Sequence, residues 1–72
     1  MNEQEGLRLL GKKVKELRKG QNLTQAEFAE KLGFSTNYVG MIERAERNIP
    51  TGNLFIIAEV SGVKVKDLFD FE

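Results

Sequence analysis

Two helix-start signals follow one another closely in the middle of this chain, with a glycine between them. In the first, Thr24 is followed by Glu27 at the spacing of a capping box, in which each residue's side chain accepts a hydrogen bond from the other's backbone amide. In the second, Ser35 can cap a new helix just after Gly33, a residue that readily adopts the left-handed backbone that ends a helix. The sequence therefore predicts two short helices joined by a tight turn, and such helices cross steeply.

Apolar residues flank both caps at the spacing of a hydrophobic staple. Leu23 and Phe28 flank the first cap, and Phe34 and Val39 flank the second. Val39 and Ile42 recur at helical spacing and are expected to face the core. This leaves the other side chains of the second helix on its remaining faces, namely Thr36, Asn37, Gly40, Met41 and Arg44.

Apolar residues at helical spacing predict three further helices. The first runs from about Leu7 to Lys19 and ends at Gly20 and Asn22, both of which tolerate a left-handed backbone. A fourth and a short fifth helix follow the central pair, separated by Gly62. Their apolar positions, with one serine, are Leu54, Ile57, Ala58 and Ser61, then Val65, Leu68 and Phe69. The chain is therefore predicted to be all-α, with residues 1–6 forming a short flexible N-terminus.

Composition excludes several functions. The chain has neither cysteine nor histidine, which removes disulfides, the usual zinc sites and the commonest general base. No nucleophile-base pair can be named, so an enzyme is not expected, nor are a metal, a cofactor or a small-molecule ligand. No leader or membrane-spanning stretch is evident, and a cytoplasmic protein is expected.

Charge is balanced but unevenly distributed. Eleven basic and eleven acidic residues give a formal net charge of zero, which by itself argues mildly against a nucleic-acid partner. Bases crowd the predicted first helix, where they are expected to be solvated more than bound to DNA, and acids dominate the C-terminus. The bases of the first helix are Arg8, Lys12, Lys13, Lys15, Arg18 and Lys19.

Residue sizes fit a close helix crossing in the central segment. A small residue is needed where the helices touch, a glycine at the turn, and branched apolar residues on the second helix. Ala29, Gly33, Val39 and Ile42 meet these demands in order. The second helix would then stand out from the body, with its N-terminal half free to enter a DNA major groove about 12 Å wide.

The sequence resembles the helix-turn-helix DNA-binding domains of the lambda and 434 repressor/Cro type, also called the XRE family. The resemblance covers nearly the whole chain, from Leu10-Gly11 to Phe69, and is most specific at Leu23-Thr24-Gln25, at Ala29 to Gly33 and at Ile42-Glu43-Arg44. It implies one compact five-helix lambda-repressor-like domain over residues 1–72, with the helix-turn-helix over about 24–44.

The resemblance also implies roles for individual residues. Base contacts fall on Ser35, Thr36, Asn37, Gly40 and Met41. Contacts to the DNA backbone fall on Gln25, Tyr38, Arg44, Arg47 and Asn48. Arg18 and Glu43 match a partly buried structural ion pair.

Some of these residues have a second interpretation. Ser35 is a cap and could be a DNA contact as well, and the ring of Tyr38 could pack on a neighbouring helix. Gly40 either admits close approach of the helix backbone to DNA or weakens the helix by about 1 kcal/mol.

The chain departs from the family pattern at three places. Ala45 stands where glycine is common, so a left-handed backbone there would be strained. The segment Ile49 to Gly52 replaces the usual start of the fourth helix and puts that start in doubt. Lys64 occupies the customary serine cap of the fifth helix.

A double-stranded DNA-binding regulator of transcription is the function that the resemblance implies. One such module buries little surface, so a homodimer on a palindromic operator is expected. Candidate dimer contacts are Val65, Leu68, Phe69 and Phe71, although Leu68 could equally complete the monomer core. Within the family, the chain looks most like controller proteins of restriction-modification systems. The alternatives are a phage-type repressor or other stand-alone bacterial regulator and, in another class, an antitoxin-like protein-binding module.

Overall fold

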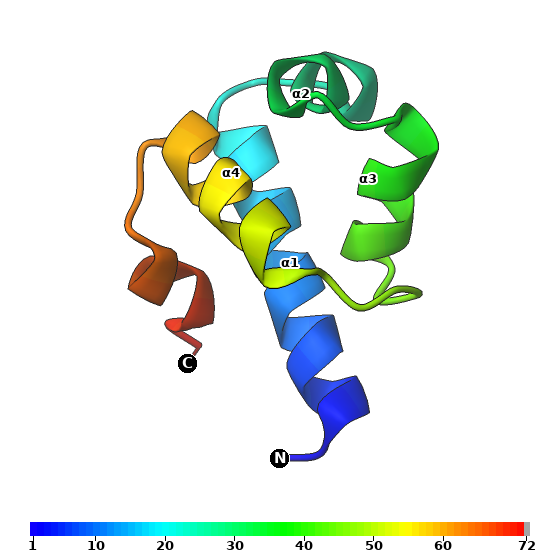
Figure 1. Ribbon diagram of the computed structural model, residues 1–72, viewed down its shortest axis with the longest axis vertical. Helices are drawn as coiled ribbons and strands as arrows, with labels where there is room; N and C mark the ends of the chain where they lie inside the picture. The colour runs from blue at the N-terminus through cyan, green and yellow to red at the C-terminus, as the bar shows by residue number, and fades with distance from the viewer. Residues whose placement is uncertain (72) are drawn as a thin grey trace.

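A computed structural model describes residues 1–71 as four α-helices followed by a 3-10 helix (Figure 1). Their bounds are α1 Glu3–Gly20, α2 Gln25–Leu32, α3 Thr36–Glu43, α4 Thr51–Ser61 and η1 Val65–Phe69. No strand occurs among these residues, and the prediction of an all-α, five-element fold is confirmed. The last element is a 3-10 helix instead of an α-helix. No helix in residues 1–71 is long and apolar enough to cross a membrane.

Helix α1 begins earlier than predicted. The Asn2 side chain accepts a hydrogen bond from the Glu5 amide at 2.8 Å, and the Glu5 carboxylate accepts one from the Asn2 amide at 3.4 Å. This capping box starts the helix at Glu3, so the predicted start at Leu7 and the short flexible segment over 1–6 are wrong. The sequence carries the signal, an asparagine followed three residues later by a glutamate.

The two caps predicted for the central helices are present. Thr24 Oγ1 accepts a hydrogen bond from the Glu27 amide at 3.1 Å, and Glu27 Oε1 accepts one from the Thr24 amide at 2.8 Å. The bond from the Thr24 amide to the carboxylate lowers the pKa of Glu27. Gly33 ends α2 with φ 76°, and Ser35 Oγ accepts from the Tyr38 amide at 3.1 Å to start α3. The helix-turn-helix thus forms from local signals.

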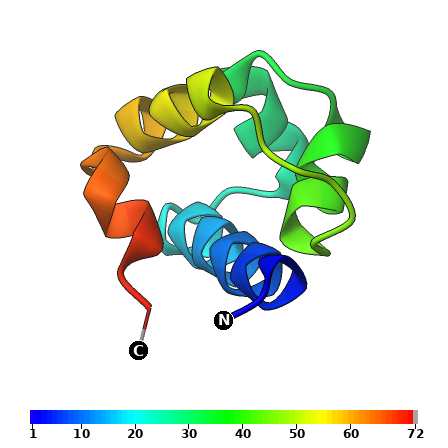
Figure 2. The ribbon, with the colours of Figure 1, turned by 60° about the horizontal axis from the view of Figure 1, so that its bottom comes forward.

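A single core holds the helices around α1, which packs against α3, α4 and η1 (Figure 2). The largest fully buried side chains come from all five elements: Val14, Phe28, Val39, Ile42, Ile57 and Leu68. In both views α3 and η1 lie on opposite sides of the molecule. The core therefore leaves two separate surfaces, one on α3 and one on η1.

Gly11 lets α1 and α3 approach closely. A Cβ atom at this position would stand 2.5 Å from the carbonyl oxygen of Ile42 and 3.0 Å from that of Glu43. Both atoms belong to the backbone at the end of α3, so no side-chain movement can make room. Only glycine fits this crossing.

The departures from the family pattern are accommodated locally. Ala45 is buried and has φ 60°, a strained conformation for alanine. Helix α4 starts at Thr51 directly after Pro50, without a side-chain cap. At η1 the Lys64 amide donates to Asp67 Oδ2 at 2.9 Å, so the carboxylate of Asp67 satisfies the amide that begins this turn.

Candidate nucleic-acid interface

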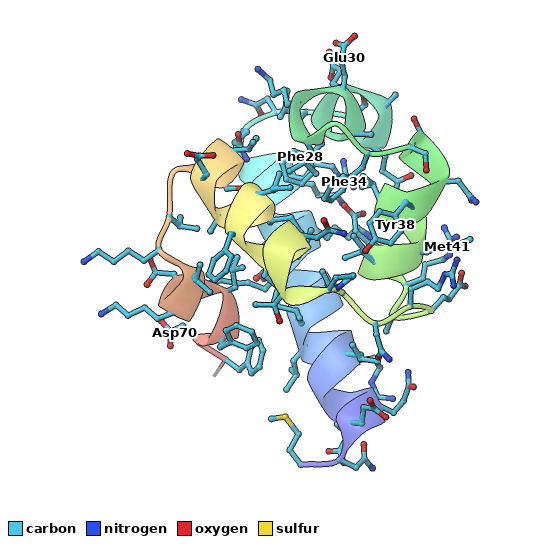
Figure 3. All side chains as sticks on the ribbon, viewed as in Figure 1. Phe28, Glu30, Phe34, Tyr38, Met41 and Asp70 are labelled. Atoms are coloured by element: carbon cyan, nitrogen blue, oxygen red, sulfur yellow. The ribbon has the colours of Figure 1, made fainter. Side chains whose placement is uncertain are left out.

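The N-terminal turn of α3 presents polar side chains to solvent. Ser35, Thr36 and Asn37 are all exposed, while Val39 and Ile42 on the opposite face are only 1% exposed. Met41 is partly exposed and points away from the molecule (Figure 3). An α-helix about 10–12 Å across with its side chains matches the width of a major groove. Four of the five predicted base contacts are therefore accessible to solvent.

Gly40, the fifth predicted base contact, is buried instead of exposed. The guanidinium of Arg44, one helical turn later, lies over Gly40. A Cβ atom at Gly40 would stand only 2.8 Å from Arg44 Nη1. Glu46 holds this guanidinium, accepting hydrogen bonds from Nε at 3.0 Å and from Nη2 at 3.2 Å. The surface at Gly40 is thus formed by the arginine side chain, which the sequence did not indicate.

A buried polar network joins α1, α2 and α3. Arg18 Nε donates to Glu43 Oε2 at 2.7 Å, Arg18 Nη2 donates to Glu43 Oε1 at 3.1 Å, and the two side chains are 9% and 3% exposed. Arg18 Nη1 also donates to the carbonyl of Leu23 at 2.8 Å. The hydrogen bond to Glu43 raises the pKa of the Arg18 guanidinium above its ordinary value. Arg18 and Glu43 therefore tie the helix-turn-helix to α1.

Gln25 is part of the same network. Its Nε2 donates to Glu43 Oε1 at 3.1 Å, and the side chain is half-buried at the start of α2. The sequence suggested a DNA-backbone contact here but gave no sign of the bond to Glu43, because the two residues lie on different helices. The bond leaves the amide carbonyl and one N–H of Gln25 for another partner.

Tyr38 is held by side chains of the turn before α3 and of α4. Its ring meets that of Phe34 edge to face, with centroids 5.2 Å apart, and its hydroxyl accepts a hydrogen bond from Asn53 Nδ2 at 3.1 Å. The ring also lines an open groove together with Arg47 and Asn48, both exposed. Three residues predicted to contact the DNA backbone therefore line the same groove. Of these three, Tyr38 is held in place by its contacts with Phe34 and Asn53.

The exposed apolar surface differs from the predicted one. Leu68 is fully buried and cannot contact another copy, because it completes the core between α1 and α4. Val65 and Phe71 pack partly against the core, whereas Phe69 is 48% exposed. Sequence periodicity missed two exposed residues of α4, Phe55 at 56% and Ile56 at 38%.

The fold and this surface define a class of protein. Helices α2 and α3, joined by a tight turn, form a helix-turn-helix. The second helix has a polar N-terminal turn on its outer side and an apolar face toward the core. The chain belongs to the helix-turn-helix family HTH_3, whose pattern matches residues 14–68, and the resemblance seen in the sequence is confirmed. No group of acidic residues that could hold a metal ion occurs in the described part of the chain.

Relatives of known type are similar over most of the chain. Control protein C.SmaI of Serratia marcescens is 35% identical over 60 residues, 83% of this chain and 71% of that protein. The restriction-modification controller protein C.AhdI from Aeromonas hydrophila superimposes with a TM-score of 0.84 at 32% identity, covering 88% of this chain and 96% of that one. SinR, a master regulator of biofilm formation crystallised with DNA, gives 0.79 at 32% identity, covering 85% and 98%.

Proposed function

We propose that this protein is a transcriptional regulator that binds double-stranded DNA in a sequence-specific manner through α3. The observation that carries the proposal is the exposed turn of Ser35, Thr36 and Asn37, held outward by the buried Val39 and Ile42. Hydroxyl and amide groups at the start of such a helix can pair with base edges in the major groove. Such a regulator acts by binding DNA and not by catalysis. It would work where the DNA is, which in a prokaryotic cell is the cytoplasm.

Within this class we favour the controller proteins of restriction-modification systems. Similarity to C.SmaI and C.AhdI supports this narrower function. If this narrower function is right, we expect endonuclease and methyltransferase genes beside the gene for this protein. Their absence beside the gene would contradict the narrower function and leave the proposal of DNA binding intact.

The protein is expected to act as a homodimer on two half-sites about one turn of DNA apart. Phe69 on η1 and the pair Phe55 and Ile56 on α4 are the large exposed apolar side chains suited to a contact, and α4 packs against η1. The position of η1 across the molecule from α3 leaves both recognition helices free (Figure 2). A two-fold contact on this side would place the same surface patch on both copies.

Selection of bound DNA from a random pool tests the proposed function directly. We expect an enriched palindromic motif and complexes of two chains per duplex by sedimentation. A flat pool, with no enriched motif at low salt, would contradict sequence-specific binding.

Asn37→Ala is expected to relax base preference at one position in each half-site. The amide of asparagine can pair with adenine through two hydrogen bonds, so its loss should cost about 1–3 kcal/mol on the preferred sequence. Competition binding with single-base variants of the selected site measures how much the protein prefers one base over the others at each position. Glu30→Gln, at an exposed residue of α2 that points away from the body (Figure 3), is the control and should keep the preference. Unchanged selectivity of Asn37→Ala would remove this residue from the base contacts.

Phe69→Gln is expected to weaken the dimer without unfolding the domain. The ring is half-exposed and packs edge to face on Phe71, so its loss should lower the free energy of unfolding by only about 1 kcal/mol, while the sedimentation coefficient falls toward that of the monomer. Lys66→Gln, on the same short element, is the matched control. If both variants sediment as the unmodified protein does, Phe69 lies outside the dimer contact.

A further inference from the structure

Arg44, the residue directly after α3, continues the helical face that carries the proposed base contacts. Each helical residue turns by about 100°, so residue 44 falls between the directions of Asn37 and Gly40, beside those of Thr36 and Met41. Long side chains on a helix lean toward its N-terminus, which brings the guanidinium back over the preceding turn. The position of the head group over Gly40 agrees with this direction.

Gly40 provides the space that the Arg44 side chain occupies. Because a Cβ at Gly40 would stand only 2.8 Å from Nη1 and 3.5 Å from Cζ, any larger residue would push the guanidinium off the helix. The head group therefore lies over the backbone of Gly40, one turn back along the helix. Glycine is unfavourable in a helix interior, but at this position it makes room for the Arg44 head group.

Glu46 orients the guanidinium without blocking all of it. The carboxylate accepts one hydrogen bond from Nε and one from Nη2, which occupies one side of the planar group. Arginine has five N–H donors, so both hydrogens of Nη1 and one of Nη2 stay free. The edge between Nη1 and Nη2 can then donate two parallel bonds while Glu46 keeps its own.

We infer that Arg44 is a specificity-determining residue that contacts a guanine in the major groove, with Gly40 making room for its side chain and Glu46 positioning it. The inference rests on the proposed function and replaces the expected backbone contact at this residue. Guanine presents the acceptors N7 and O6 at the spacing of the guanidinium fork, the commonest specific arginine contact in DNA. Glu46 reduces the rotamer freedom lost on binding, and its negative charge disfavours a phosphate at the same place.

Four variants test this contact by the bases that each selects from a random pool. The unmodified protein should require guanine at one position of each half-site. Arg44→Ala and Arg44→Lys should both lose that preference by about tenfold or more, because lysine keeps the charge but not the fork. Gly40→Ala should weaken the preference at the same position while the domain is at least as stable, since only the flexible end of Arg44 has to move and alanine is the better helix former. Glu46→Gln should lower the preference and raise the affinity for unrelated DNA.

Arg47→Ala provides the comparison for a phosphate contact, and Arg8→Ala on the exposed face of α1 is the charge control. A phosphate contact would weaken binding to every sequence alike and flatten the slope of log affinity against log salt by about one unit. If Arg44→Ala does this, or if Arg44→Lys and Gly40→Ala select the original motif, the inference is overturned. If the unmodified protein selects no motif, the proposed function fails instead.

Discussion

Glu43→Ala is expected to destabilise the domain more than any other single substitution considered for this chain, by about 3–5 kcal/mol. Removing the carboxylate leaves the Arg18 guanidinium buried and without its counter-charge, and it also removes the acceptor of Gln25. A domain of this size is stable by roughly 4–11 kcal/mol in total, so the variant loses a large share of its stability. Urea denaturation followed by circular dichroism gives the difference.

Two controls separate the buried charge from other effects. The double variant Arg18→Met with Glu43→Leu removes both charges and should be more stable than Glu43→Ala, because no uncompensated charge stays buried. Glu46→Ala breaks an ion pair whose side chains are 54% and 52% exposed, and should change stability by about 1 kcal/mol or less. Equal losses for Glu43→Ala and Glu46→Ala would contradict the importance of burial.

Gly11→Ala is expected to lower stability by about 1–3 kcal/mol, although alanine is the better helix former. The added methyl collides with the backbone carbonyls of Ile42 and Glu43, so α3 must move away from α1. A loss of this size lowers the melting temperature by about 4–8 °C per kcal/mol in a small domain. Because the movement displaces the end of α3, affinity for the selected DNA should fall as well.

Gly20→Ala is the matched control for Gly11→Ala. Both glycines lie in α1, but a Cβ at Gly20 would meet nothing within 4 Å. This variant should be as stable as the unmodified protein or more stable by about 0.4–1 kcal/mol, through reduced freedom of the unfolded chain. A Gly11→Ala protein as stable as Gly20→Ala would show that the crossing of α1 and α3 tolerates the extra atom.

Features formed between residues close in sequence were predictable. The caps at Thr24 and Ser35 and the turn at Gly33 follow from residue types at short spacing, and all three are present in the structure. The exposure of Thr36, Asn37 and Met41 follows from helical periodicity. The capping box at Asn2 was equally local, and the late start expected for α1 came from following apolar spacing alone.

Features formed between distant segments could not be predicted in the same way. Periodicity placed Leu68 on an apolar face but did not say whether the core or a second copy would cover it. It identified Tyr38 as a candidate contact without showing that Asn53 bonds its hydroxyl. The sequence of one helix shows which residues share a face. What covers that face depends on how several helices pack.

The sequence by itself determined the helices, the turn and the polar edge of α3, because hydrogen bonds and backbone preferences within a few residues decide them. Tertiary structure alone decided that Gly11 must be small and that Gln25 joins the ion pair of Arg18 and Glu43, a pair that the family resemblance had indicated. Both features depend on distances between helices. Such distances are set only when the whole core has packed.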